Sequence, residues 1–378
     1  GSGKSTHLPP PCVPRMLAAT ANPLQGFFDE CPLTEIAKDK SVLWSISADS
    51  TVREALEELK NRRILSLPMI DDREKFIAIV SISDIVRAIV MDKSFDKFAS
   101  GRVRPQEKDI RALLKQSTVF RRTISTMVGN TEESKTFRVF DEKTSFSHLF
   151  RHFSQGFHRA LVMRREGEGG CLISQSDCVR FIYKKMMEES GKEEVENLAR
   201  KPLSELGVLY NVHALSIKDT ETALAGFRKM LRWRAFSKWN LGAIPVVDKK
   251  GRVVANLSES DLRGADRASF VDLLKPVVEY LRTTHGSVRT PVAATGATTF
   301  SEAIRTILDE KIHRLWIVNK DGDPIGVVSL SDIISKFTNF NWAHTRAYEL
   351  ALDFQQEPEP EPHYVQQQEE RKKRCTIM

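Results

Sequence analysis

One short motif occurs four times in this chain, each time in the same setting. The pattern Ser-x-Ser-Asp closes four blocks, which end at Asp84, Asp177, Asp261 and Asp332. In every block the first Ser of the motif lies 16 residues after the start of a short apolar run. Those runs are Leu65 to Ile70, His158 to Met163, Gly242 to Val247 and His313 to Val318. Four copies in one register indicate an internal repeat, which constrains the fold more than any single element does.

The fourth block shows how one repeat is built. Thr299 followed by Glu302 is the pattern of a capping box, and the apolar residues after it have helical spacing. The segments that follow predict a strand from His313 to Val318, a turn, a second strand from Ile325 to Ser329, and a helix that begins at Asp332. The other blocks predict the same order, with strand pairs Leu65–Ile70 and Phe76–Ser81, His158–Met163 and Cys171–Ser174, and Ala243–Val247 and Val253–Ser258.

The domain organisation follows from the size of this unit. About 50 residues bury too little apolar surface to be stable alone, so the repeats are expected to pair. The predicted fold is α/β (α+β), with two lobes over residues 32–190 and 201–340 and disordered terminal segments. The expected boundaries are 1–31 for a Pro-rich segment, 32–92, 131–190, 201–266 and 288–340 for repeats 1 to 4, 93–130 for a basic linker, 267–287 for a connecting helix, and 341–378 for a tail.

Two basic segments leave alternatives open. The linker from Asp92 to Val128 predicts a solvated connection with a surface helix, or else a contact surface for a partner. An insertion in the third block, Arg232 to Asn240, mixes basic and aromatic residues. It predicts an extended amphipathic helix with its Trp residues packed inward, or a surface for nucleic acid or a protein. Residues 269–283 predict a single amphipathic helix.

Composition excludes several classes of protein. The chain has 378 residues, a net charge of +7 and five scattered cysteines with no C-x-x-C pair, so a disulfide framework and a zinc site are not expected. No apolar run approaches 18 residues, so no membrane span is predicted. No histidine is paired with a Ser or Cys nucleophile in a recognisable pattern. The sequence therefore predicts a cytoplasmic protein without catalytic activity, metal or cofactor.

The repeat resembles the CBS (cystathionine beta-synthase) domain. The stretches that carry this resemblance include Ala243 to Asp248, Gly251 to Val254, Lys311 to Leu315 and Gly326 to Ile333. The resemblance implies four CBS repeats arranged as two tandem pairs, or Bateman modules. The third and fourth blocks are most similar to the gamma regulatory subunit of AMP-activated and sucrose-non-fermenting protein kinases, and the first lobe matches less closely.

In that family the motif aspartate holds the ribose of an adenosine nucleotide, AMP, ADP or ATP. A carboxylate can accept hydrogen bonds from both ribose hydroxyls, and a nearby Ser hydroxyl can reach ribose or phosphate. The resemblance therefore implies ribose contacts from Asp84, Asp177, Asp261 and Asp332, and hydroxyl contacts from Ser81, Ser174, Ser258 and Ser329. The alternative is that each aspartate only caps its helix, and both roles are compatible.

Phosphate binding would require fixed positive charge. In the family a His-Arg pair at the start of a strand faces phosphate, which implies this role for His158, Arg159, His313 and Arg314. The alternative is a pair of basic residues at a strand edge. The first and third blocks carry Leu65-Ser66 and Gly242-Ala243 there, which departs from the kinase gamma pattern, in which the first block also supplies an arginine. We therefore expect the sites around Asp177 and Asp332, or their paired partners, to bind best.

The tail predicts a lipid anchor. A Glu-Pro stretch is followed by Arg371 to Arg374 and then by Cys375 to Met378, which fits the C-a-a-X pattern for farnesylation of Cys375. One lipid and a basic cluster together give stable membrane attachment. The alternative is a disordered basic tail. A cytoplasmic membrane surface is the expected location, and a nuclear location stays open.

Together these features predict a regulatory adenosine-nucleotide sensor. Ligand would bind between paired repeats and change their contact with the catalytic and scaffold subunits of a protein kinase. One alternative is a free-standing CBS scaffold that binds a different protein. Another is a nucleic-acid adaptor that uses the basic linker and the insertion, which the mild net charge does not favour.

Overall fold

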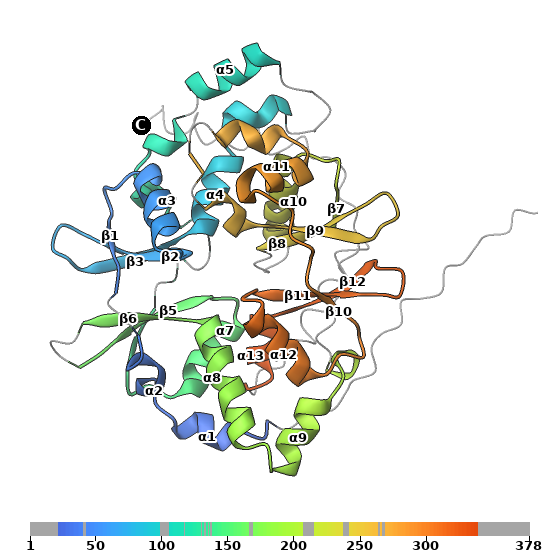
Figure 1. Cartoon of the computed structure of the whole chain (residues 1–378). Helices are drawn as coiled ribbons and strands as arrows, with labels where there is room; N and C mark the ends of the chain where they lie inside the picture. The colour runs from blue at the N-terminus through green and yellow to red at the C-terminus, as the bar shows by residue number, and fades with distance from the viewer. Residues whose placement is uncertain are drawn as a thin grey trace, which may run out of the picture.

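A computed structural model describes residues 22–40, 43–98, 106–116, 118–129, 138–165, 169–206, 215–236, 242–263 and 269–338, together with residues 131, 134, 136, 265 and 266. The tail with Cys375 and the end of the insertion in the third block lie outside these ranges. Four similar units surround a common centre, with repeats 1 and 3 in the upper half of Figure 1 and repeats 2 and 4 in the lower half.

Each repeat holds one small three-stranded sheet, in which a short first strand runs parallel to the second and the third returns antiparallel. Repeat 1 comprises β1 (Ile46–Ser47), α3 (Val52–Asn61), β2 (Ser66–Ile70), β3 (Phe76–Ser81) and α4 (Ile82–Val90). Repeat 2 comprises β4 (Val139–Asp141), α7 (Phe146–Ser154), β5 (Arg159–Met163), β6 (Gly170–Ser174) and α8 (Gln175–Glu188).

The second half of the chain repeats this order. Repeat 3 comprises β7 (Ile217–Lys218), α10 (Ala223–Phe236), β8 (Ala243–Val247), β9 (Val253–Ser258) and a 3-10 helix, η6 (Glu259–Leu262). Repeat 4 comprises β10 (Ala293–Ala294), α12 (Phe300–Asp309), β11 (Arg314–Val318), β12 (Pro324–Ser329) and α13 (Leu330–Ser335). The predicted order of helix, strand, turn, strand and helix is confirmed in all four repeats. The short first strands were not predicted, because two or three residues carry no periodicity.

Local sequence explains where the helices begin. At α12 the Thr299 side chain accepts from the backbone N–H of Glu302, and the Glu302 carboxylate accepts from the backbone N–H of Thr299. Thr51 and Glu54 form the same capping box at α3. Each such box satisfies backbone N–H groups that have no partner within the helix, and is typically worth about 1 kcal/mol.

The segments that precede the repeats are exchanged between neighbours. We call residues 31–37, 122–128, 201–206 and 275–281 the lead-ins of repeats 1, 2, 3 and 4. Each lead-in forms a bridge with the other repeat of its tandem pair: Pro32 with Ser145, Thr123 with Thr51, Pro202 with Thr299, and Pro276 with Thr222. This reciprocal exchange joins repeat 1 to repeat 2 and repeat 3 to repeat 4, which are the two expected tandem modules.

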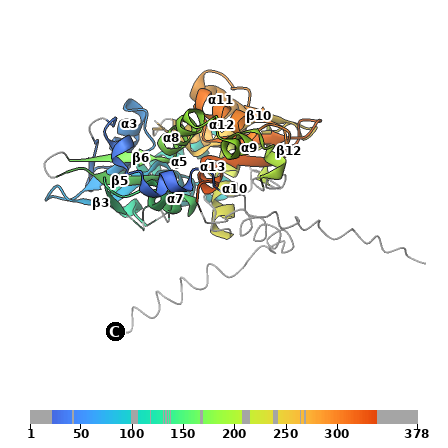
Figure 2. The same ribbon diagram turned by 90° about the horizontal axis from the view of Figure 1, so that it is seen from below.

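The apolar cores, in contrast, cross the boundary between the modules. We expected each module to enclose a core of its own. One continuous cluster instead joins repeats 1 and 3, where α4 contacts α10 and η6. A second cluster joins repeats 2 and 4, where α13 contacts α7 and α8. Helices make these contacts between the modules, and Figure 2 shows α7, α8 and α13 next to one another near the middle of the molecule.

The N-terminal segment corrects one expectation. Residues 22–31 were assigned to a disordered segment, yet Gln25–Glu30 forms α1, and Leu24 and Phe28 are buried in the second core. Phe28 packs edge-on against Phe150 and Phe337, with ring centroids 4.9 and 5.8 Å away. This apolar anchor outweighs the ordering entropy of a short segment. The lead-in that follows continues through α2 (Thr34–Ala37).

The linker and the connecting helix also differ from their predictions. The linker does form a surface helix, α5 (Glu107–Gln116), but Phe95, Val119 and Phe120, in its short helical turns η1 (Lys93–Phe98) and η2 (Val119–Arg121), are buried in the first core. A further turn, η3 (Ile124–Met127), belongs to the lead-in of repeat 2. The linker is therefore part of repeat 1 as well as a connection.

The single helix expected over residues 269–283 is two elements. These are η7 (Ser269–Leu274) and α11 (Val277–His285), with Pro276 at the start of the second. Proline has no N–H group and restricts the residue before it to extended conformations, so the helix cannot run through this position. Helix α9 (Glu193–Arg200) and the turn η4 (Leu203–Glu205) complete the connection between the modules.

Candidate functional site

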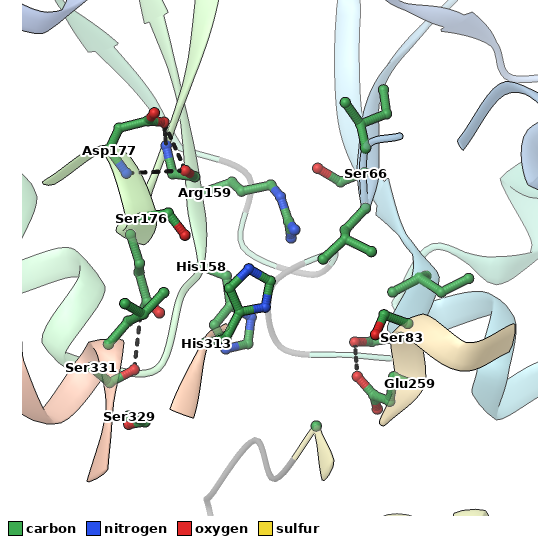
Figure 3. Close-up of a pocket in the computed structure, with 18 of the residues that line it drawn as sticks. Ser66, Ser83, His158, Arg159, Ser176, Asp177, Glu259, His313, Ser329 and Ser331 are labelled. Carbon is green, nitrogen blue, oxygen red and sulfur yellow. Dashed lines mark hydrogen bonds between the residues drawn. The ribbon is translucent and has the colours of Figure 1, made fainter. Parts of the chain in front are cut away.

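A cavity of about 390 Å³ lies at the centre of the molecule, where the four repeats meet. Its size falls within the ~300–1,000 Å³ of typical ligand sites. Figure 3 shows side chains from several repeats converging on it. The predicted site residues that line it are His158, Arg159, Ser174, Asp177, Ser258, His313, Arg314, Ser329 and Asp332. Ser81, Asp84 and Asp261 are not among its lining residues.

The four motif aspartates share one structural role. In each copy the backbone N–H of the first motif Ser donates to an oxygen of the motif Asp, at 3.0, 2.8, 2.7 and 2.8 Å for Ser81, Ser174, Ser258 and Ser329. A capping box is present at all four helix starts. Each motif aspartate therefore caps its helix, a role that is compatible with ligand binding. In each copy the cap uses Oδ2. The repeats differ in the groups that contact Oδ1 and in any further contact to the carboxylate.

In repeat 1 the carboxylate is closed in. Asp84 is fully buried, and its Oδ1 accepts from Thr131 Oγ1 at 2.8 Å and from Ser134 Oγ at 2.7 Å. Burial raises the pKa of this carboxyl, against the effect of the hydroxyl donors. Both hydroxyls come from the residues that follow the lead-in of repeat 2. They occupy the positions from which ribose hydroxyls would have to donate.

In repeat 3 a histidine takes the corresponding place. His285 Nε2 lies 3.0 Å from Asp261 Oδ1. His285 ends α11, the helix that continues the lead-in of repeat 4. Tyr280 of the same helix donates its hydroxyl to the backbone carbonyl of Asp261. The structure therefore places Asp261 against α11 rather than at the cavity.

In repeat 2 the aspartate faces the cavity and meets a lysine. Lys40 Nζ lies 2.7 Å from Asp177 Oδ2, and Arg180 Nη1 lies 3.7 Å from Asp177 Oδ1. Lys40 follows the lead-in of repeat 1 and lines the cavity itself. In repeat 4 Asp332 also lines the cavity, with Ser329 Oγ donating to it at 2.6 Å. Asp177 and Asp332 are thus the two motif aspartates that the cavity brings together.

The His-Arg pairs of repeats 2 and 4 supply positive charge to the same cavity. Arg159 and Arg314 begin β5 and β11, so both pairs enter the cavity from strand ends. Figure 3 shows His158 and His313 near each other, with Arg159 extended toward the side of Ser66. Burial, together with Arg314, Arg159 and His158, lowers the pKa of His313 to about 4. The His313 ring is accessible from within the cavity, so water there moderates this effect.

Three charged lining residues were not predicted from the sequence. Lys40 and Arg63 add positive charge, and Glu259 adds a buried carboxylate. Glu259 occupies the variable position of Ser-x-Ser-Asp, as Gln175 does in repeat 2. Comparing that variable position among the repeats would have singled out Glu259. No local pattern marks Lys40 as a site residue, because it reaches Asp177 only through the exchange of lead-ins between repeats 1 and 2.

The variable position also joins the modules beside the cavity. Gln175 Nε2 donates to Ser331 Oγ at 2.8 Å, which links repeats 2 and 4. Ser83 Oγ donates to Glu259 Oε2, which links repeats 1 and 3. Within the described ranges, no cluster of His, Cys, Asp and Glu could hold a metal ion, and no helix is long and apolar enough to cross a membrane.

Comparison with known proteins fits this repeat architecture. A model of the CBS domain family matches residues 35–91 and 286–339, which fall on the first and fourth repeats. The chain contains CBS domains. The second and third repeats have the same element order and the same motif as the two repeats that the model matches.

The proteins that are similar to this chain include one that is named as a kinase regulatory subunit. The chain is 24% identical to Protein sds23/moc1 of Schizosaccharomyces pombe, over 82% of this chain and 79% of that protein. It is 22% identical to the SNF1-related protein kinase regulatory subunit gamma-1 of Arabidopsis thaliana, over 84% of each. The fold is similar to that of protein MJ1225 from Methanocaldococcus jannaschii, with a TM-score of 0.56 and 17% identity, over 81% of this chain and 99% of that one.

Proposed function

We propose that the central cavity of this CBS protein binds an adenosine nucleotide, and that the protein acts as a non-catalytic regulatory subunit. The observation that carries the proposal is the convergence of two motif aspartates and two His-Arg pairs on one cavity. A nucleotide presents ribose hydroxyls, which donate hydrogen bonds, and phosphates, which need cations. In the cavity, Asp177 and Asp332 offer acceptors, and Arg159 and Arg314 offer positive charge.

The ribose contacts are assigned to Asp177 and Asp332. Each carboxylate is fixed by its capping box, so a ligand would meet it in one orientation. Ser174 and Ser329 lie beside them and also line the cavity. The other two sites, around Asp84 with Ser81 and around Asp261 with Ser258, stay predictions from the family resemblance. Thr131, Ser134 and His285 would have to move before ribose could reach those carboxylates.

The phosphates are assigned to the two His-Arg pairs. Arg159 and Arg314 carry charge at every physiological pH, and their planar donor groups suit phosphate oxygens. The lowered pKa of His313 keeps its ring neutral in the empty cavity, so the ring can donate one hydrogen bond without adding to the repulsion among the arginines. Bound phosphate would raise that pKa by supplying the opposite charge.

The regulatory role draws on the relatives. The SNF1-related gamma-1 protein is named as a kinase regulatory subunit, and this chain is similar to it over 84% of its length. A ligand that binds where four repeats meet can change how the two modules contact a partner, provided its affinity differs between the two states. Co-purification with a kinase catalytic subunit, with and without AMP, tests this part. Attachment to a membrane through Cys375 stays a prediction from the sequence.

Calorimetric titration with AMP, ADP and ATP tests the binding site. Asp177→Asn and Asp332→Asn keep the size of the side chain and remove its charge, so each is expected to weaken binding at its site by about tenfold or more. Asp321→Asn, in the exposed turn before β12, is the matched control. No binding by the unmodified protein, or equal affinity in all three variants, would contradict the proposal.

A further inference from the structure

A buried acidic side chain lies in the cavity that gathers the proposed phosphate ligands. Glu259 is 6% exposed, lines the cavity and begins η6 of repeat 3. Ser83 Oγ of repeat 1 donates to its Oε2, which fixes the carboxylate between the modules. Figure 3 shows this pair on the opposite side of the cavity from Asp177. Nothing in the assigned ribose and phosphate contacts uses this charge.

The place of this carboxylate depends on a glycine. Gly242 stands where repeats 2 and 4 carry His158 and His313. A Cβ atom at Gly242 would lie 3.2 Å from Glu259 Oε2 and 3.3 Å from Arg314 Nη2. The missing side chain therefore leaves one small volume that the carboxylate of repeat 3 and the guanidinium of repeat 4 both border. Arg314 is one of the proposed phosphate ligands.

We propose that Glu259 is a selectivity residue, which limits how many phosphates the cavity accepts. This inference rests on the proposed function and deepens it. The carboxylate attracts Arg314 in the empty cavity and repels any phosphate that approaches the same guanidinium. A nucleoside monophosphate carries about two negative charges and a triphosphate about four, so the repulsion grows with each phosphate. The cavity thus discriminates against triphosphates by charge.

The charge of Glu259 distinguishes the selectivity role from a purely structural one. A structural glutamate would need only an acceptor for Ser83, which a glutamine oxygen also supplies. The selectivity role needs the negative charge itself. Glu259→Gln removes the charge, keeps the length of the side chain and retains an acceptor for Ser83.

The experiment titrates AMP, ATP and inorganic tripolyphosphate into the full chain and into Glu259→Gln. The variant is expected to bind ATP and tripolyphosphate about tenfold more tightly, and AMP about threefold more tightly, because fewer charges are relieved for AMP. Glu310→Gln, an exposed residue at the end of α12, controls for the change in net charge. Thermal unfolding of each variant verifies that it is folded.

A second variant protects the test against a folding defect. Ser83→Ala removes the donor to Glu259 but leaves its charge, so it is expected to keep the preference for AMP over ATP. Unchanged or weaker tripolyphosphate binding in a folded Glu259→Gln protein overturns the selectivity role. Failure of the unmodified protein to bind any nucleotide overturns the proposed function instead. If Glu259→Gln does not fold, Ser83→Ala decides. The same ratio of ATP to AMP affinity as in the unmodified protein supports the inference, and a changed ratio overturns it.

Discussion

Lys40 Nζ lies 2.7 Å from Asp177 Oδ2, so an ammonium from the start of the chain neutralises a motif aspartate of repeat 2. The two residues are brought together by the exchange of lead-ins, and Lys40 is only partly exposed. A ribose at Asp177 would have to displace this contact or share the carboxylate with it. Lys40 therefore competes with the proposed ligand at one of the two motif aspartates that line the cavity.

Replacing Lys40 is expected to change the affinity and its dependence on salt. Lys40→Gln should strengthen nucleotide binding at Asp177 by about threefold to tenfold, because the competing ion pair is lost. The gain should shrink at high ionic strength, where salt already screens the pair in the unmodified protein. Calorimetry at two salt concentrations measures both effects. Lys38→Gln, on the same segment but paired with Glu35 at the surface, is the control. Weaker nucleotide binding in Lys40→Gln would mean that Lys40 holds phosphate instead.

Stability should depend on pH through His313. Its pKa is about 4 in the folded protein, against an ordinary value of 6.5. Between these values the unfolded chain binds more protons than the folded one, so the free energy of unfolding decreases as the pH falls below about 6.5, and this loss levels off below about 4. Denaturant titrations at several pH values, compared between the unmodified protein and His313→Asn, measure this contribution. The same pH dependence in both proteins would assign it to other groups.

Nucleotide binding should take up protons in mildly acidic solution. A bound phosphate opposes Arg314, Arg159 and His158, which with burial lower the pKa of His313. The pKa of His313 then rises above its value of about 4 in the empty cavity, and the ring gains a proton at pH values between the pKa of the empty site and that of the occupied site. Calorimetric enthalpies in buffers of different ionisation heat report this uptake directly. Uptake that persists unchanged in His313→Asn would exclude His313 as its source.

The closed carboxylate of repeat 1 should matter for stability and not for binding. Thr131→Val keeps the shape of the side chain but leaves Asp84 Oδ1 without one of its two hydroxyl donors. The expected loss is about 1–3 kcal/mol of unfolding free energy, because the acceptor is buried. Urea denaturation measures it, with the exposed Ser125→Ala as control. A change in AMP affinity larger than twofold would show that this site takes part in binding after all.

The N-terminal anchor should be required for folding of repeats 2 and 4. Phe28 is fully buried between Phe150 and Phe337. Phe28→Ala is expected to cost about 3–5 kcal/mol, the usual range for a core phenylalanine. Thermal or denaturant unfolding measures it, and Phe27→Ala at the partly exposed neighbouring position should cost clearly less. Equal small effects at both positions would mean that α1 contributes little to the core.

Much of the fold was predictable because the information is local. The second and third strands of each repeat, and the helices around them, follow from apolar runs, turn residues and capping boxes within 50 residues. The motif itself located the cavity-facing Asp177 and Asp332. The two His-Arg pairs were located by the resemblance to the CBS family.

The remaining features depend on contacts between distant segments. The pairing of α4 with α10, the approach of Lys40 to Asp177 and the contact of His285 with Asp261 join residues that no local pattern relates. The four copies of the motif look equivalent in sequence, yet segments that follow the lead-ins give three of the aspartates different neighbours, which are Thr131 and Ser134 at Asp84, Lys40 at Asp177 and His285 at Asp261. The motif alone implies four similar sites, whereas the His-Arg pairs favour the sites at Asp177 and Asp332, and these are the two motif aspartates that line the cavity.

The crossed arrangement of lead-ins and cores has a practical consequence for dissecting the molecule. A fragment that ends near residue 190 would keep the exchanged segments of repeats 1 and 2, but it would expose the faces of α4 and α8 that the other half normally covers. A fragment that holds repeats 1 and 3 would lose the lead-in bridges that join each of them to the other repeat of its module. We therefore expect residues 22–338 to be the smallest fragment that folds on its own. The two halves of the chain are expected to fold only when they are co-expressed.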